Sequence, residues 1–230
     1  RMDGCSDYVD TVPVANKAGT YKVYYKVFGD KNHTDGEEAS VEVTIAKRKL
    51  SQTTITYNTT ATYTGSAITD VGLKIHDPEL KRDLVLNEDY RIISYADNIN
   101  VSDPDNDKYA SFEIEGIGNY KGSVQVRYTI ATRKIPELTV FTDQSEYPYS
   151  GEEIVPVVTV KDGERELTIG SDYVLAGALS AKKEGTYYIT VTGKGNYTGN
   201  VTLTYTVTQP AQPEPTPEPD PDPTPEPEKP

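Results

Sequence analysis

Two stretches of the chain resemble each other. Gly-Ile-Gly-Asn-Tyr-Lys-Gly occupies residues 116–122 and continues as Ser-Val-Gln-Val-Arg-Tyr-Thr-Ile to residue 130. Gly-Lys-Gly-Asn-Tyr-Thr-Gly begins 77 residues later, at residues 193–199, and continues as Asn-Val-Thr-Leu-Thr-Tyr-Thr-Val to residue 207. After each glycine-rich loop, apolar and polar residues alternate with a period of two, which predicts a β-strand with one buried face. The expected inward positions are Val124, Val126, Tyr128, Ile130, Val201, Leu203, Tyr205 and Val207.

The glycine-rich loop itself is predicted to be a hairpin connection. Glycine and asparagine tolerate positive φ, which tight connections require, and the tyrosine is placed where its ring can fold onto the end of a core. A phosphate-binding loop is the alternative, but neither a helix nor a Lys-Ser/Thr pair follows the last glycine. The predicted structural turn residues are Gly116, Gly118, Asn119, Tyr120, Gly193, Gly195, Asn196 and Tyr197.

Further landmarks define the repeat and its boundaries. Tyr-Thr-Gly at residues 63–65 matches Tyr-Ser-Gly at 149–151, and Ala-Gly-Thr-Tyr at 18–21 matches Glu-Gly-Thr-Tyr at 184–187. We predict a truncated repeat at residues 1–48, two fuller repeats at 49–132 and 133–208, and a linker at 209–230. Because the first repeat is too short to include the opening strands of the other two, we expect its apolar strand faces to be uncovered.

Composition limits the size of each core and the class of partner. Only 35% of the residues are hydrophobic, and 18 tyrosines stand against 3 phenylalanines, which suits several small, half-wet β modules. The net charge of −13 argues against nucleic acid and anionic membrane surfaces, and the sequence has no apolar run long enough for membrane insertion. A single cysteine, Cys5, excludes an internal disulfide.

The C-terminal segment has a different composition from the rest. Prolines alternate with Glu, Asp and Thr, as in Pro-Glu-Pro-Thr-Pro-Glu-Pro-Asp-Pro-Asp-Pro at residues 213–223. Such a run has no apolar side chains to bury and few N–H donors for a ladder. We expect a disordered, extended spacer of roughly 3 Å per residue, on the order of 60 Å in all.

These motifs resemble the MBG-type and related immunoglobulin-like repeats of surface proteins from gut Firmicutes. The segment from Ala18 to His33, continuing to Val-Thr-Ile-Ala-Lys at Lys47, is similar to the second half of one MBG repeat. The resemblance implies an all-β fold of tandem immunoglobulin-like β-sandwich repeats with a disordered Pro-rich C-terminal tail. It also implies an extracellular, cell-wall location and a role as spacer or adhesin rather than enzyme.

Candidate chemistry is sparse. His33 and His76 have no patterned acid or cysteine beside them, so neither a catalytic triad nor a zinc site is predicted. Asp103, Asp105 and Asp107 alternate as in Ca²⁺ loops, but the turn glycine and distal glutamate of an EF-hand are missing. Two interpretations stay open for this loop, a solvated loop and a weak Ca²⁺ site, and no other cofactor is expected. A Lys–Asn or Lys–Asp crosslink is not predicted, because the inward positions hold no lysine.

Three functional hypotheses follow. The first is a non-catalytic surface spacer or adhesin stalk, whose partners are neighbouring repeats of the same chain. The second is a module that binds an extracellular glycan or a host protein through outward tyrosines, of which Tyr24 and Tyr188 are the candidates. The third is an accessory region of a larger extracellular enzyme.

Overall fold

The computed structural model describes residues 1–5 and 7–209. Within them every regular element is a β-strand, apart from three short 3₁₀ turns, η1 (Leu50–Gln52), η2 (Pro104–Asn106) and η3 (Ile135–Glu137). The predicted all-β class is therefore confirmed, and the strands form several small sheets, consistent with β-sandwich packing. The predicted linker at 209–230 lies, except for Gln209, outside the described residues.

The chain divides into two compact units, and the division falls between Arg133 and Lys134. This division falls next to the predicted boundary at 132/133. The predicted separation of residues 1–48 as a domain of their own stays a prediction, because they belong to the first compact unit.

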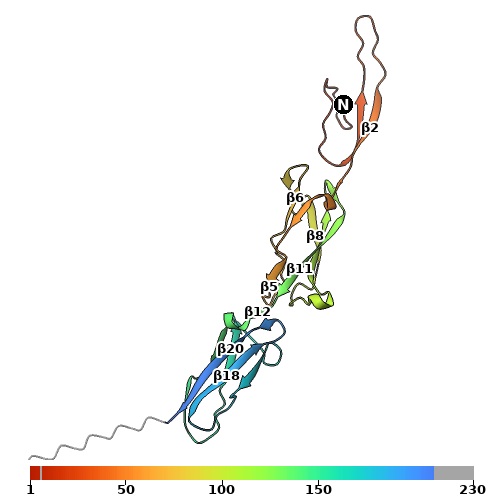
Figure 1. Cartoon of the computed structure of the whole chain (residues 1–230). Helices are drawn as coiled ribbons and strands as arrows, with labels where there is room; N and C mark the ends of the chain where they lie inside the picture. The colour runs from red at the N-terminus through yellow and green to blue at the C-terminus, as the bar shows by residue number, and fades with distance from the viewer. Residues whose placement is uncertain (6, 210–230) are drawn as a thin grey trace, which may run out of the picture. The chain divides into compact units, whose positions relative to one another are not determined.

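The N-terminal hairpin consists of β1 (Gly19–Tyr25) and β2 (Ala39–Ile45), drawn in orange in Figure 1. The two strands pair antiparallel, from Gly19 opposite Ile45 to Tyr25 opposite Ala39. Several apolar side chains of this segment are strongly exposed, among them Val27 at 70% and Val41 at 49%. Uncovered apolar side chains were expected for this segment, although β1 ends two residues before Val27.

The middle module (residues 48–131) contains nine strands. They are β3 (Arg48–Lys49), β4 (Thr54–Thr56), β5 (Thr60–Thr62), β6 (Lys74–Asp77), β7 (Arg82–Asp83), β8 (Tyr90–Ala96), β9 (Ala110–Gly116), β10 (Tyr120–Lys121) and β11 (Ser123–Ala131). They form a three-stranded sheet in the order β4-β6-β7, a four-stranded sheet in the order β5-β11-β9-β8, and a short pair of β10 with β3.

The C-terminal module (residues 134–208) has the same strand order. Its strands are β13 (Thr139–Thr142), β14 (Glu146–Pro148), β15 (Val158–Asp162), β16 (Arg165–Glu166), β17 (Tyr173–Gly177), β18 (Gly185–Gly193), β19 (Tyr197–Thr198) and β20 (Asn200–Thr208), preceded by β12 (Arg133–Lys134). The sheets run β13-β15-β16 and β14-β20-β18-β17, with β12 beside β19. In Figure 1, β18 and β20 lie side by side as the blue centre of the larger sheet.

In both modules an early strand lies parallel to the last strand. Residues 60–62 pair with 129–131, and residues 146–148 pair with 206–208. The flanking hydrogen bonds are also equivalent, because Tyr63 N donates to Ala131 O at 2.9 Å and Tyr149 N donates to Thr208 O at 2.7 Å. The matched Tyr-Thr-Gly and Tyr-Ser-Gly landmarks therefore mark where the chain leaves this parallel pair.

Each module has its own hydrophobic core. The inward positions predicted on β11 and β20 are buried or half-buried, and Tyr128, Ile130, Tyr205 and Val207 are at most 2% exposed. Among the described residues before Arg48 there is no buried hydrophobic side chain. The cores of the modules are formed by Leu50, Tyr63, Val71, Ile75, Leu84, Tyr90, Ala110, Phe112, Ile114, Tyr120, Val126, Tyr128 and Ile130, and by Ile135, Tyr147, Val160, Leu167, Tyr173, Ala181, Ile189, Val191, Tyr197, Tyr205 and Val207.

Candidate functional site

The glycine-rich loop connects β9 to β11 and also pairs with the first residues of the module. Strands β9 and β11 are antiparallel neighbours, and Gly116 N donates to Gly122 O at 2.9 Å, so the loop closes a hairpin. Within it, Tyr120 and Lys121 pair in parallel with Arg48 and Lys49, the first residues of the module. The loop therefore holds the start of the module as well as turning the chain.

The glycines of this loop are needed for two different reasons. Gly118 and Gly195 have φ of +58° and +65°, which side-chain-bearing residues rarely adopt. Gly116 has no such φ, but a Cβ there would lie 2.7 Å from Lys121 N, which is too close. Asn119 and Asn196, expected to use positive φ, are not among the described non-glycine residues that do so.

The tyrosine of the loop lies in the core of each module. Tyr120 is 0% exposed, and its hydroxyl donates to Asp77 Oδ2 at 3.0 Å. Tyr197 is 2% exposed, and its hydroxyl donates to Asp162 Oδ2 at 3.3 Å. Each ring thus fills the core while its hydroxyl reaches a carboxylate at the end of β6 or β15, which satisfies the buried polar group.

Asp77 is fully buried and surrounded by donors. Its Oδ1 accepts from the backbone N–H groups of Glu79 at 3.0 Å and Leu80 at 3.1 Å, and Arg48 Nε lies 2.7 Å from its Oδ2. Burial alone raises the pKa of Asp77, but the hydrogen bonds from Leu80, Tyr120 and Glu79, with the charge of Arg48, outweigh it and lower that pKa. The carboxylate therefore stays ionised inside the module.

A second ion pair lies beside the first. Arg82 reaches both carboxylate oxygens of Asp89, at 2.7 and 2.8 Å, and Asp89 Oδ2 also accepts from Val85 N at 3.0 Å. The hydrogen bonds from Arg82 lower the pKa of Asp89, although burial opposes them. The Arg82 guanidinium also lies over the Tyr120 ring, 5.7 Å from its centroid, so the two ion pairs flank one aromatic ring.

The C-terminal module contains the equivalent groups. Thr168 N donates to Asp172 Oδ2 at 3.0 Å, as Val85 N does to Asp89, and Arg165 Nη2 lies 3.6 Å from the same oxygen. Sequence reasoning missed these groups, because single Asp and Arg residues in polar stretches are usually solvated charges. Aligning the two repeats residue by residue would have shown Asp77, Arg82 and Asp89 recurring as Asp162, Arg165 and Asp172.

We call Arg48, Asp77, Arg82, Asp89 and Tyr120 the entry cluster of the middle module. Its two arginines are paired with its two aspartates, although Arg48 Nε, which is buried 2.7 Å from Asp77 Oδ2, does not have hydrogen-bond geometry. The backbone N–H groups near the loop are also engaged, since Ile117 N donates to Asp89 O at 2.8 Å and Tyr120 N to Ile117 O at 2.9 Å. This arrangement suits holding the chain in place, and it does not resemble a cradle of free N–H groups for phosphate.

The acidic loop of the middle module has a separate geometry. Asp107 Oδ1 lies 2.8 Å from Arg127 Nη2, and Asp103 Oδ2 accepts from Asn106 Nδ2 at 2.7 Å. Asp105 lies within η2 and is exposed. No group of three or more His, Cys, Asp or Glu that could hold a metal occurs in the part of the chain that the structure describes.

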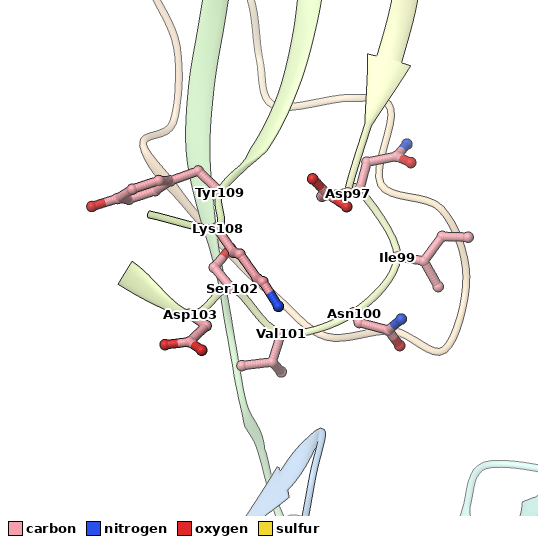
Figure 2. A pocket seen from close by; sticks show the side chains of 9 residues that line it. Asp97, Ile99, Asn100, Val101, Ser102, Asp103, Lys108 and Tyr109 are labelled. Carbon is pink, nitrogen blue, oxygen red and sulfur yellow. The ribbon is translucent and has the colours of Figure 1, made fainter. Parts of the chain in front are cut away.

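A hollow of about 520 Å³ lies beside this loop. Figure 2 shows its lining side chains around the segment from Asp97 to Asp103, with Lys108 extending into the space between them. The lining is mostly polar and carries one cation, Lys108, among the carboxylates of Asp97 and Asp103.

The remaining candidates are surface residues. His33 Nδ1 lies 2.7 Å from Asp30 Oδ1, and His76 Nδ1 lies 2.7 Å from Asp83 Oδ1, so each histidine does have an acid beside it, contrary to the sequence expectation. All four side chains are well exposed.

The two outward tyrosines differ. The Arg1 guanidinium covers the Tyr24 ring at 4.5 Å, whereas Tyr188 is 57% exposed on β18. Of the two tyrosines considered as platforms, Tyr188 is thus the more open.

A scan against protein-family models finds no matching family, and a search of curated proteins finds no match. Across the described residues, no helix is long and apolar enough to cross a membrane.

Proposed function

We propose that this chain is a non-catalytic extracellular repeat region that acts as a surface spacer or adhesin stalk. Its modules would be tandem immunoglobulin-like sandwiches on a cell-wall surface, as the sequence resemblance implies. The observation that carries the proposal is the parallel pairing of an early strand with the last strand in both modules.

Parallel pairing determines how a module bears tension. Pulling on the two chain ends draws β5 toward its N-terminal side and β11 toward its C-terminal side. Because the strands are parallel, this load acts along them and shears all of their hydrogen bonds together. The bonds at both ends of the pair, Thr129 N to Thr59 O and Tyr63 N to Ala131 O, are each 2.9 Å and share the load. The same holds for β14 and β20.

The entry cluster supports the same role. Between β3 and the end of the 3₁₀ turn, the chain is held by the pairing with β10, by the ion pair of Arg48 with Asp77 and by the buried Leu50. A tension applied at Arg48 is therefore transmitted to the core through several contacts, rather than peeling the first residues away.

A second candidate function is binding of an extracellular glycan or a host protein. Tyr188 favours it, because a 57% exposed aromatic ring on a threonine-rich sheet face offers a stacking surface. Binding of the full chain to a glycan array or to mucin, abolished by Tyr188→Ala and kept by Tyr24→Ala, would support this candidate.

The test of the spacer proposal is stretching of the intact chain by its two ends. A load-bearing spacer should show two separate, high-force unfolding events, one per module. Extension at low force without distinct events would argue against it.

A further inference from the structure

Asn119 contacts the N-terminal hairpin segment through its side-chain amide. Ala18 N donates to Asn119 Oδ1 at 2.8 Å, and Asn119 Nδ2 donates to Asn16 O at 3.2 Å. The main-chain carbonyl of Asn119 accepts from Arg48 N at 2.9 Å. One residue of the glycine-rich loop therefore touches the segment before β1 and the segment after β2.

The conformation of the loop does not explain an asparagine at this position. Asn119 does not have the positive φ for which asparagine is often selected in turns. What asparagine offers instead is an NH2 donor group beside a C=O acceptor on a short, planar side chain, and here a backbone C=O and a backbone N–H bond to one each. The contact thus resembles one step of strand pairing made by a side chain.

The contact lies next to the covalent connection between the hairpin and the middle module. β2 ends at Ile45, and β3 begins at Arg48, so the covalent connection has two residues and leaves from one strand of the hairpin. The other strand begins at Gly19, opposite Ile45, and directly follows the segment that Asn119 holds. Two attachments on neighbouring strands restrict rotation that the covalent connection alone would permit.

We propose that Asn119 is a joint residue. Its side-chain amide hydrogen-bonds the backbone of residues 16–18 and thereby fixes the orientation of the hairpin on the middle module. The partner it fits is a backbone C=O and a backbone N–H two residues apart, just before a Gly-Thr-Tyr strand, whatever the side chains there. The benefit of a stiff joint rests on the proposed spacer function, but the contact itself does not.

The test is a nuclear magnetic resonance measurement on the full chain. Residual dipolar couplings from residues 19–45 and from residues 48–131 should fit one alignment tensor, and the Ala18 amide should exchange slowly with solvent. In Asn119→Ala the two sets should need separate tensors, and Ala18 exchange should accelerate roughly tenfold, as expected for loss of one hydrogen bond.

One further variant separates the two hydrogen bonds of the joint, and another serves as a control. Asn119→Asp keeps the acceptor for Ala18 and loses the donor to Asn16, so Ala18 should stay protected. Asn106→Ala is the matched control, because its amide bonds Asp103 inside its own loop, and it should leave the single tensor unchanged.

The inference is overturned if the unsubstituted chain already needs two tensors, or if Asn119→Ala keeps one tensor and a protected Ala18. If Asn119→Ala unfolds the middle module, a change at Ala18 can be used instead. Ala18→Pro removes the backbone N–H that donates to Asn119 and leaves the glycine-rich loop intact, whereas Ala18→Ser keeps this N–H. Ala18→Pro should then split the tensor and Ala18→Ser should not. The unfolding force of the modules tests the spacer proposal separately. If that force is unchanged in these variants while the tensor splits, the joint is lost and the spacer proposal stands.

Discussion

The hydroxyl of Tyr120 donates to Asp77 Oδ2 at 3.0 Å, and both side chains are fully buried. The tyrosine comes from the loop before the last strand, and the aspartate from the end of β6 in the other sheet. This hydrogen bond therefore connects the short pair of β10 with β3 to the three-stranded sheet, at the end of the middle module where the chain enters. Tyr197 and Asp162 repeat it at 3.3 Å in the C-terminal module.

Removing only the hydroxyl tests that connection. Tyr120→Phe preserves the volume of the ring but leaves the buried Asp77 carboxylate without one of its donors. We expect the free energy of unfolding of the middle module to fall by about 1–3 kcal/mol, measured by urea titration with resonances of that module as probes. A loss below about 0.3 kcal/mol would mean that the hydroxyl contributes little.

Removing the whole ring tests the packing at the same position in the C-terminal module. Tyr197 is 2% exposed, so Tyr197→Ala should cost about 3–5 kcal/mol through lost burial and a cavity. Tyr188→Ala, at a 57% exposed position of the same module, is the control and should change the stability by less than about 0.5 kcal/mol. Equal effects of the two changes would contradict the placement of Tyr197.

Acid should weaken the middle module through its entry cluster. The folded-state pKa values of Asp77 and Asp89 are lowered, so their stabilising contribution is present above the unfolded pKa, about 4, and is lost as pH falls through the folded values. The melting temperature should be flat from neutral pH to about 5 and should then decline. The double variant Asp77→Asn with Asp89→Asn should have a lower melting temperature at neutral pH, and this temperature should depend less on pH. An equally steep acid decline in that variant would assign the effect to other carboxylates.

Calcium distinguishes the two interpretations of the acidic loop. Asp107 is paired with Arg127, and Asp103 is bonded to Asn106, so the carboxylates are directed to protein partners. We expect millimolar Ca²⁺ to leave the melting temperature of the chain unchanged. A rise that Asp103→Asn abolishes would establish a site, and Arg127→Ala, which releases Asp107, shows whether the arginine prevents one.

Periodicity predicted the strands well where they are long and half-buried. The alternation in residues 123–130 and 200–207 placed the correct side chains in the core, because a two-sheet module buries one face of each strand. The two-residue strands β3 and β10 could not be predicted, since Arg48-Lys49 and Tyr120-Lys121 carry no period and pair over a long sequence separation. Asp77 was missed for a related reason, because its burial depends on donors from Tyr120 and Arg48, which only the fold brings together.

The role of Asn119 was predicted in part. The expected hairpin connection was found, but the amide contacts a segment more than 100 residues earlier, which local turn chemistry does not indicate. The inward tyrosine was easier to predict, because an aromatic residue between two glycines at the end of a strand has few alternatives to the core.

The most direct test of the spacer proposal compares two pulling directions in a Cys5→Ser background. Pulling the middle module through the chain ends should give a high-force event with a contour-length gain on the order of 25 nm, because β5 and β11 are sheared. Pulling through cysteines introduced at Thr59 and Thr129, at the same end of the pair, should open the strands one bond at a time at a markedly lower force. Equal forces in the two directions would contradict the account.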